Sequence, residues 1–318
     1  MPGFATHYLF GIDSLKRMEK NKLRDIINKN RRVYQLGLQG PDIFFYYLPS
    51  YLMYEENPGS LVHHSNASLY FRNCIKNIDK ERNTKKKEIA IAYLCGILGH
   101  YTLDFTTHPY IYYMTDFHEK TSEYYGRHIA FETKINEYLL YKKRHLMASQ
   151  FYNDSTVRIT KNEAEVVAKI LSATYKDTFE GYNMSKKNVL SALNYFQKSI
   201  RLLRGPGGKK RKLIGFFEKL ILGNTYFSNI IDLDEHVEGE LYMNFSHKMW
   251  KNPWDNSITS NKSFFELTKD AKKIYKETLD AVNDYFTLDD NKKKNYKKLI
   301  QLIGNKSYHS GLDCGIPT

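Results

Sequence analysis

Along most of this chain, hydrophobic residues recur every three or four positions with polar residues between them, as on amphipathic helices. Near the N-terminus, segment 15–27 follows this spacing approximately, with lysines and arginines between its apolar positions. Segment 88–108 is apolar almost all round over its first half, which predicts a buried central helix. The same spacing predicts further helices over residues 120–145, 162–175, 186–203 and 263–286.

Few segments show the alternating pattern that is typical of strands, and the aromatic run 44–47 is interpreted as packing rather than as a strand. The sequence therefore predicts a mostly α fold, a multi-helix bundle, in a single domain over residues 1–318. The charged stretch 77–87 predicts a solvated loop or the start of a helix. Segment 204–212, rich in glycine, lysine and arginine, predicts a flexible basic surface loop, with contact to an anionic surface as the alternative.

The charge balance favours anionic partners. Forty-eight lysines and arginines against 35 aspartates and glutamates give a net charge of +13. Membrane surfaces, nucleic acids and phosphorylated small molecules all fit such a charge, which by itself does not choose among them. The three cysteines lie far apart without a CxxC pair, so neither a disulfide framework nor a thiolate zinc site is indicated.

The chain shows no segment that predicts membrane insertion or export. Its longest apolar run, residues 89–99, has 11 residues, whereas a spanning helix needs roughly 18 or more. The N-terminal residues lack the basic region of a secretory signal. We therefore expect a cytoplasmic protein without a transmembrane segment, with secretion by an unusual route as the alternative.

Candidate chemistry gathers in the predicted central helix. His100, Asp104 and His108 follow one another at i, i+4 and i+8, so they project from one stripe of a helix. Burying them is costly unless they coordinate a metal ion or satisfy one another. His128 and Glu132 form a second i, i+4 pair. Imidazole and carboxylate ligands suit zinc, so the pattern favours a metal site over a hydrogen-bonded polar core.

Five stretches of the first 145 residues, in this order, resemble the zinc-dependent phospholipase C family: MPGFATH at 1–7, LQGPDIF at 38–44, GSLVH at 59–63, GHYTLDFTTH at 99–108 and HIAFE at 128–132. This family includes the bacterial phosphatidylcholine-cleaving enzymes and clostridial alpha-toxin. The stretches also resemble the related single-strand-specific zinc nucleases. The resemblance implies a helical bundle that holds zinc ions, with residues 1–145 carrying the ligands and residues 146–318 forming a helical remainder.

The family pattern implies a ligand set for each zinc ion. Carried over to this chain, it assigns Asp42, His63, His100 and Asp104 to one ion, His108, His128 and Glu132 to a second, and His7, the bridging Asp104 and the N-terminal amine to a third. In the phospholipases the aspartate equivalent to Asp42 is also a candidate general base.

This chain departs from that pattern at its N-terminus, and the pattern leaves open which of two adjacent histidines is a ligand. Family members use an N-terminal tryptophan for the third zinc ion, and this chain begins with Met-Pro-Gly instead, so we expect two or three Zn²⁺ ions. His63 and His64 are adjacent, and the Gly-Ser-x-x-His spacing favours His63 while leaving His64 as the alternative.

The other histidines are interpreted as lying outside the site. His118 and His145 have no ligand-spaced partner and are interpreted as surface or capping residues, while His247 and His309 stand alone. His236 lies among acidic residues, where an acidic helix start is a more common explanation than a second metal site.

These observations lead to one main hypothesis and two alternatives. The main hypothesis is a zinc-dependent phosphodiester hydrolase, a phospholipase C-like enzyme that cleaves phospholipid to diacylglycerol and a phosphorylated headgroup. The alternatives are a zinc-dependent single-strand nuclease and a non-catalytic, metal-stabilised binding protein of the same fold. Nucleic acid is the less favoured substrate, and peripheral contact with an anionic membrane surface is compatible with the charge.

Overall fold

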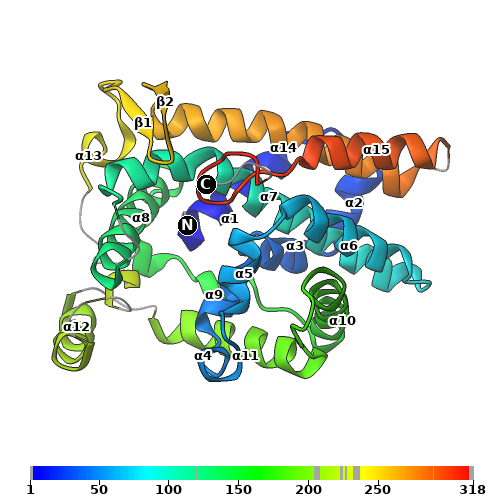
Figure 1. The fold of residues 1–318 in the computed structure, drawn as a ribbon, viewed down its shortest axis with the longest axis horizontal. Helices are drawn as coiled ribbons and strands as arrows, with labels where there is room; N and C mark the ends of the chain where they lie inside the picture. The colour runs from blue at the N-terminus through cyan, green and yellow to red at the C-terminus, as the bar shows by residue number, and fades with distance from the viewer. Residues whose placement is uncertain are drawn as a thin grey trace.

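The computed structural model describes residues 3–118, 121–203, 208–222, 225, 228–231, 237–288 and 290–314. Within these residues the fold is almost entirely helical, with one two-stranded sheet (Figure 1). The predicted mostly α bundle is therefore confirmed.

The elements follow one another along the chain with short connections. The α-helices of the first half are α1 (Phe4–Arg17), α2 (Lys22–Lys29), α3 (Arg31–Gly37), α4 (Ser50–Met53), α5 (Pro58–His64), α6 (Ala67–Asp79), α7 (Thr84–Met114) and α8 (Ser122–Arg144). Those of the second half are α9 (Asn153–Thr156), α10 (Lys161–Thr178), α11 (Lys186–Leu203), α12 (Gly208–Leu222), α13 (Glu240–Met243), α14 (Phe264–Thr287) and α15 (Lys292–Ile303). Short 3-10 helices are η1 (Gly40–Tyr46), η2 (Ala148–Gln150) and η3 (Ser228–Ile230), and the strands are β1 (Trp250–Asn252) and β2 (Asp255–Ser260).

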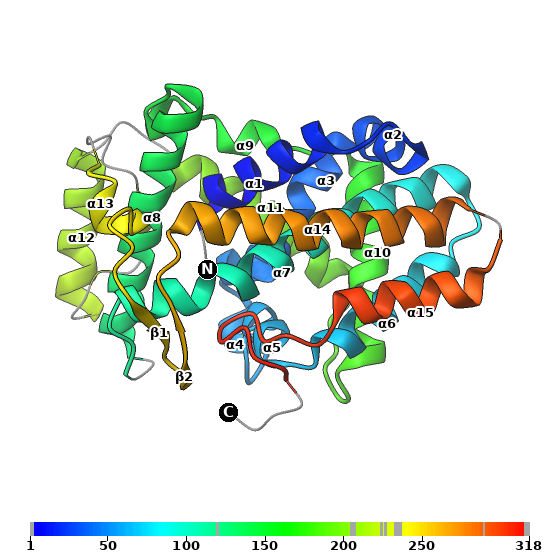
Figure 2. The ribbon, with the colours of Figure 1, turned by 90° about the horizontal axis from the view of Figure 1, so that it is seen from above.

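Helix α7 is the buried central helix that the sequence predicts. It lies in the middle of the molecule, with α1, α2, α3, α10 and α14 packed around it (Figures 1 and 2). By length and composition alone it is apolar enough to cross a membrane, but 89% of its apolar window is buried inside the fold. Neighbouring helices therefore cover most of its hydrophobic surface, as in the core of a globular domain.

Two glycines let α3 and α7 approach closely. A Cβ atom on Gly37 would lie 2.5 Å from the backbone oxygen of Tyr93, and one on Gly96 would lie 2.3 Å from that of Tyr34. Close contact at this crossing brings η1, which directly follows α3, next to the second half of α7. The crossing thus positions the residues of η1 for the site described below.

The other long helices match their predicted segments. Helices α8, α10, α11 and α14 agree to within three residues at each end with the segments expected at 120–145, 162–175, 186–203 and 263–286. Helix α10 begins at a capping box formed by Thr160 and Glu163, and α14 begins at another formed by Ser263 and Glu266, which satisfy backbone N–H groups that have no partner within the helix. Segment 15–27 is divided between two helices, because Asn21 caps the start of α2.

One prediction for the second half of the chain needs correction, and one element there was not predicted. The basic loop expected at 204–212 is wrong for residues 208–212, which begin α12; residues 204–207 lie outside the described part. Lysine and arginine are good helix formers and here continue directly into an apolar helical pattern, which explains the difference. The hairpin of β1 and β2 was not predicted, because its strands are short and only one of them has a buried position.

Candidate metal centre

The structure brings together side chains from five elements around the second half of α7. His7 comes from α1, Asp42 from η1 and His63 from α5. Helix α7 itself contributes His100, Asp104 and His108, and α8 contributes His128 and Glu132. These are the eight residues that the family pattern implies, and they fall into three groups whose ligand atoms lie within 4.8 Å of one another: His7, Asp42 and His100; His63, His100 and Asp104; and His108, His128 and Glu132.

Asp104 lies at the middle of this cluster and is completely buried. Its Oδ1 atom is 3.2 Å from Nε2 of His7. Its Oδ2 atom is 3.1 Å from Nε2 of His100 and 3.7 Å from Nε2 of His63. One carboxylate therefore faces ring nitrogens on two sides, which is the arrangement expected of a bridging ligand.

Asp42 lies close to two of the same imidazoles. Its Oδ1 atom lies 3.5 Å from Nε2 of His63 and 3.5 Å from Nε2 of His100. The preceding Gly40 makes this approach possible, because it has φ +52° and a Cβ atom there would lie 2.3 Å from the ring of His100. Only glycine adopts this conformation without strain and without displacing the imidazole.

The third group lies further along α7, where that helix meets α8. Nε2 of His128 is 2.9 Å from Oε1 of Glu132, one helical turn later. Nε2 of His108 is 3.7 Å from the same oxygen. The i, i+4 spacing in α8 and the crossing of α7 and α8 thus bring the imidazoles of His128 and His108 to one carboxylate, that of Glu132.

Hydrogen bonds on the outer side of the rings hold four of these imidazoles in orientation. The Nδ1 partners are the backbone oxygen of Gly59 for His63 (2.7 Å), that of Leu38 for His100 (3.2 Å), that of Tyr308 for His108 (2.5 Å), and the hydroxyl of Tyr124 for His128 (3.0 Å). A carbonyl can only accept, so Nδ1 carries the proton in the first three and Nε2 presents its lone pair to the cluster. Imidazoles that bind metals are commonly oriented in this way.

Several buried ring nitrogens and carboxylate oxygens of the cluster lack hydrogen-bond partners among the described residues. They are both ring nitrogens of His7, Oδ1 of Asp42, Nε2 of His63, His100 and His108, and both carboxylate oxygens of Asp104. The short contacts between them lie at ion-pair distance without hydrogen-bond geometry. So many buried polar atoms without partners are costly unless a cation binds between them, and nitrogen and oxygen donors suit zinc. The residues present therefore fit a zinc centre.

Burial sets the protonation of the cluster. It lowers the pKa of His7, His63 and His128 to about 4 each, so these rings are neutral near pH 7. It raises the pKa of Asp42 to about 8, because burial outweighs the imidazole of His100, which lowers this pKa; the carboxylate of Asp104 raises it by a smaller amount. For His100, burial opposes protonation, but the carboxylates of Asp104 and Asp42 outweigh it and raise the pKa.

The pKa of Asp104 moves the other way. Burial alone would raise it, but the imidazoles of His100, His108 and His7 outweigh burial and hold the pKa well below its ordinary value. Asp104 is therefore ionised throughout the neutral range, as a metal ligand must be.

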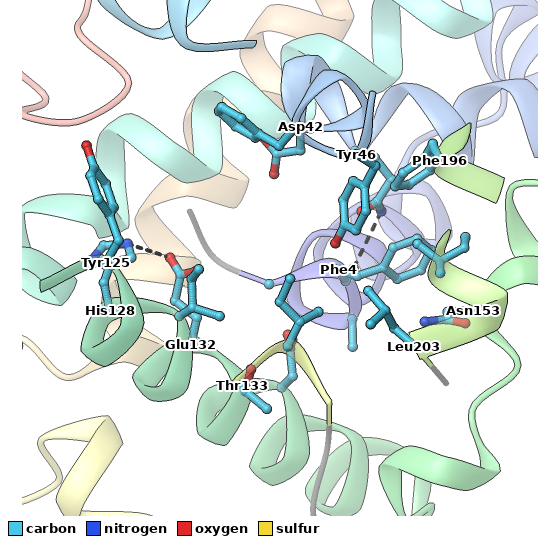
Figure 3. A pocket seen from close by; sticks show the side chains of 18 of the residues that line it. Phe4, Asp42, Tyr46, Tyr125, His128, Glu132, Thr133, Asn153, Phe196 and Leu203 are labelled. Carbon is cyan, nitrogen blue, oxygen red and sulfur yellow. Dashed lines mark hydrogen bonds and ion pairs between the residues drawn. The ribbon is translucent and has the colours of Figure 1, made fainter. Parts of the chain in front are cut away.

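A cavity of about 370 Å³ opens beside the cluster and has two chemically different ends. Asp42, His63, His128 and Glu132 line one end. Aromatic and aliphatic side chains line the other, among them Phe4, Phe151, Phe196, Ile200 and Leu203. Figure 3 shows Asp42, His128 and Glu132 facing the open space from one side and Phe4, Phe196 and Leu203 from the other.

The adjacent histidines His63 and His64 have different surroundings, and only His63 belongs to a ligand group. The side chain of His64 is 43% exposed and its Nδ1 atom lies 3.2 Å from Glu56, away from the three ligand groups. His118 and His247 are exposed as well, and His145 ends α8 in the left-handed conformation, in agreement with a capping role. His236 and the first two residues lie outside the described part of the chain.

One prediction about the histidines was wrong, because His309 does not stand alone. It follows α15 in a C-terminal segment that folds back over α7, and it lines the cavity. Its ring centroid lies 5.5 Å from that of His63 and 6.0 Å from that of His108. No local spacing in the sequence marks this residue, since only the return of the C-terminal segment places it there.

The fold and the cluster define an all-α protein with a buried centre of histidine and carboxylate ligands beside a cavity. The particular family follows from sequence comparison: the pattern of the zinc-dependent phospholipase C family matches residues 6–190, more than half of the chain, and the protein belongs to this family. It is accordingly a zinc-dependent hydrolase of that family. No curated protein and no solved structure gave a significant match.

Proposed function

We propose that this protein is a phospholipase C-like phosphodiester hydrolase that cleaves phospholipid to diacylglycerol and a phosphorylated headgroup. The observation that carries this proposal is the two-ended cavity, in which candidate zinc ligands lie opposite an apolar lining. A phospholipid has the same division, with a phosphodiester on one side and hydrocarbon on the other.

In this proposal the eight clustered residues hold two or three zinc ions. Asp42, His63, His100 and Asp104, whose ligand atoms are joined by contacts of 3.1 to 3.7 Å, form one site, and His108, His128 and Glu132 form the second. His7 and the second oxygen of Asp104 are available to a third ion. When bound, zinc supplies Lewis acidity toward phosphate oxygens and lowers the pKa of water to about 7.

The chain's own residues orient the reaction. Asp42 lines the cavity, and while its Oδ1 atom faces His63 and His100, the side chain as a whole is still 15% exposed, so its carboxylate is placed to accept the proton of an attacking water. The attack forms a bond between water oxygen and phosphorus while the bond from phosphorus to the diacylglycerol oxygen breaks. The leaving oxygen then takes up a proton.

The lining of the cavity favours lipid over nucleic acid. Although the chain carries a net charge of +13, neither lysine nor arginine is among the described residues that line the cavity. Proteins that bind single strands follow the phosphate backbone with a positively charged groove. A single phosphodiester next to hydrocarbon needs no such groove.

The test is hydrolysis by the zinc-loaded protein of phosphatidylcholine and, separately, of single-stranded DNA. We expect release of phosphorylated headgroup from the lipid only. Asp42→Asn should reduce this turnover by about a hundredfold or more, in the range of lost general-base catalysis. The matched control is Asp116→Asn, an exposed aspartate after α7, which should leave the rate unchanged.

Other results would contradict the proposal. Cleavage of DNA without cleavage of lipid would support the nuclease, and a full complement of zinc without turnover of either substrate would support a non-catalytic binding protein.

A further inference from the structure

Helix α12 has its hydrophobic side on the outside of the molecule. Leu213, Phe216, Phe217 and Leu220 follow the i, i+3, i+4, i+7 spacing of one helical face, which we call the outer face of α12. Phe216 is 64% exposed and Leu220 is 73% exposed. A helix on the surface of a globular protein normally turns such a face toward the core, so this orientation needs an explanation.

Two charged residues on the inner face of α12 hold the helix to the protein by specific hydrogen bonds. Arg211 donates to Oδ1 of Asn229 at 2.9 Å and to the backbone oxygen of Ile231 at 3.1 Å. Glu218 accepts from the backbone N–H of Ser228 at 2.8 Å. These bonds determine which side of the helix faces the protein. The apolar side is exposed because it lies opposite to them.

The same contacts join α12 to the candidate zinc site. Helix η3, whose Asn229 accepts one of the bonds from Arg211, is bound in turn to α8: Thr133 donates to the backbone oxygen of Asn229 at 2.8 Å. Helix α8 carries His128 and Glu132, and both Thr133 and Ile230 line the cavity. A surface that binds the outer face of α12 is therefore held close to the cavity.

A second exposed apolar group lies at the cavity. Leu48, Tyr51, Leu52 and Met53, at and just before helix α4, are all more than half exposed, and Leu52 is 94% exposed. Tyr51 of this group lines the cavity. Helices α4 and α12 both lie along the lower edge of the molecule in the view of Figure 1.

Lysines accompany the outer face of α12. Lys209, Lys212 and Lys219 are exposed on this helix, and no ion pair joins them to a carboxylate among the described residues. An apolar stripe of phenylalanine and leucine beside lysines is typical of helices that lie in the interface of an anionic membrane.

We propose that the outer face of α12 docks on an anionic phospholipid surface, with phenylalanine and leucine inserted between the headgroups and the lysines on the lipid charges. The purpose of this docking, bringing the cavity to its substrate, rests on the proposed function. A second copy of the chain fits this face less well, because pairing two such helices would bring their lysines together and cost free energy by charge repulsion.

The test measures binding of the full-length protein, in buffer that contains zinc, to phosphatidylcholine vesicles with and without phosphatidylserine, in the Asp42→Asn background to prevent turnover. We expect tighter binding to the phosphatidylserine vesicles, and weaker binding as salt increases. Phe216→Ser with Leu220→Ser should reduce binding about tenfold or more. Lys212→Glu with Lys219→Glu should remove the preference for the anionic vesicles.

Matched controls come from the opposite edge of the molecule. Ile258→Ser replaces an exposed apolar residue of β2, and Lys269→Glu with Lys273→Glu reverses two exposed lysines of α14. Neither control should change vesicle binding. Equal losses in the controls and the α12 variants would overturn the inference, since the effect would then depend on general charge or hydrophobicity.

A soluble substrate separates this inference from the proposed function. With Asp42 restored, Phe216→Ser with Leu220→Ser should keep full turnover of short-chain phosphatidylcholine below its micelle concentration and lose turnover on vesicles. Unchanged vesicle binding, or a change from dimer to monomer in its place, would overturn the docking while leaving the hydrolase proposal intact. Vesicle binding through α12 by a protein that hydrolyses no phospholipid would instead overturn the hydrolase proposal alone.

Discussion

The hydroxyl of Tyr112 lies 2.7 Å from Nδ1 of His309, although 197 positions separate the two residues in the sequence. Tyr112 is in the last turns of α7, and His309 is in the segment that follows α15. Both side chains line the cavity next to His128. This contact ties the C-terminal segment to the candidate zinc site and holds the His309 ring at the cavity wall.

His309 should therefore affect turnover without affecting zinc content. It lines the cavity but belongs to none of the three groups that could hold a metal ion. We expect His309→Ala to lower kcat/KM for phosphatidylcholine about tenfold or more, and Tyr112→Phe to lower it about fivefold, as one lost hydrogen bond of about 1 kcal/mol implies. Metal analysis beside the kinetics tests this, with the exposed His247→Ala as control. A loss of zinc in His309→Ala would show that the residue is a ligand instead.

Replacing Asp104 should reduce the binding of more than one zinc ion. Its two oxygens face His7 on one side and His63 and His100 on the other, so an amide in its place weakens two sites together. We expect Asp104→Asn to lose more than one equivalent of zinc per chain, as measured by elemental analysis of the purified protein. Asp116→Asn should retain all of it. Unchanged metal content in Asp104→Asn would rule out the bridging role.

Zinc binding should release protons near pH 7. Without metal, Asp42 has a pKa of about 8 and is mostly protonated at pH 7, and the pKa of His100 is also raised. His7, His63 and His128, with pKa values of about 4, are already neutral and have no proton to release. Since zinc binds the deprotonated ligands, its affinity should rise as the pH increases toward 8.

Calorimetry in buffers of different ionisation enthalpy measures this proton release. At pH 7 we expect about one proton fewer from Asp42→Asn than from the unchanged protein. Above pH 8 the difference should shrink, because Asp42 is then ionised before zinc binds. A binding enthalpy that does not depend on the buffer would contradict the prediction.

Gly40 should be required for the site because of both its backbone and its missing side chain. Gly40→Ala places a methyl group 2.3 Å from the His100 ring at φ +52°. Gly181→Ala is the matched control, since Gly181 has φ +74° and no atom within 4 Å of the added Cβ. Both variants should lose about 1 to 2 kcal/mol of unfolding free energy from backbone strain.

Only Gly40→Ala should also lose zinc, because only there must the imidazole move. Denaturant unfolding and metal analysis of the two variants separate these effects. Equal zinc content in both would show that the His100 ring can shift without cost to the site.

The sequence determined the long helices and part of the site. Helical periodicity depends on neighbours three and four positions apart, so it located α7, α8, α10, α11 and α14 without tertiary information. The same local geometry placed His100, Asp104 and His108 on one stripe of a buried helix. The joining of His7, Asp42 and His63 to that stripe came from the family resemblance, since no local pattern connects α1, η1 and α5.

Tertiary structure decided the rest. It placed His309 at the cavity, put His63 in a ligand group while leaving His64 outside all three, and gave the cavity its apolar end. It also oriented α12 with its apolar face outward, although the helical pattern of 213–220 by itself would indicate burial. A sequence pattern determines which residues share a face of one element. What that face contacts depends on how segments distant in the sequence pack against it. In α12 the hydrogen bonds of Arg211 and Glu218 hold the opposite face against the protein.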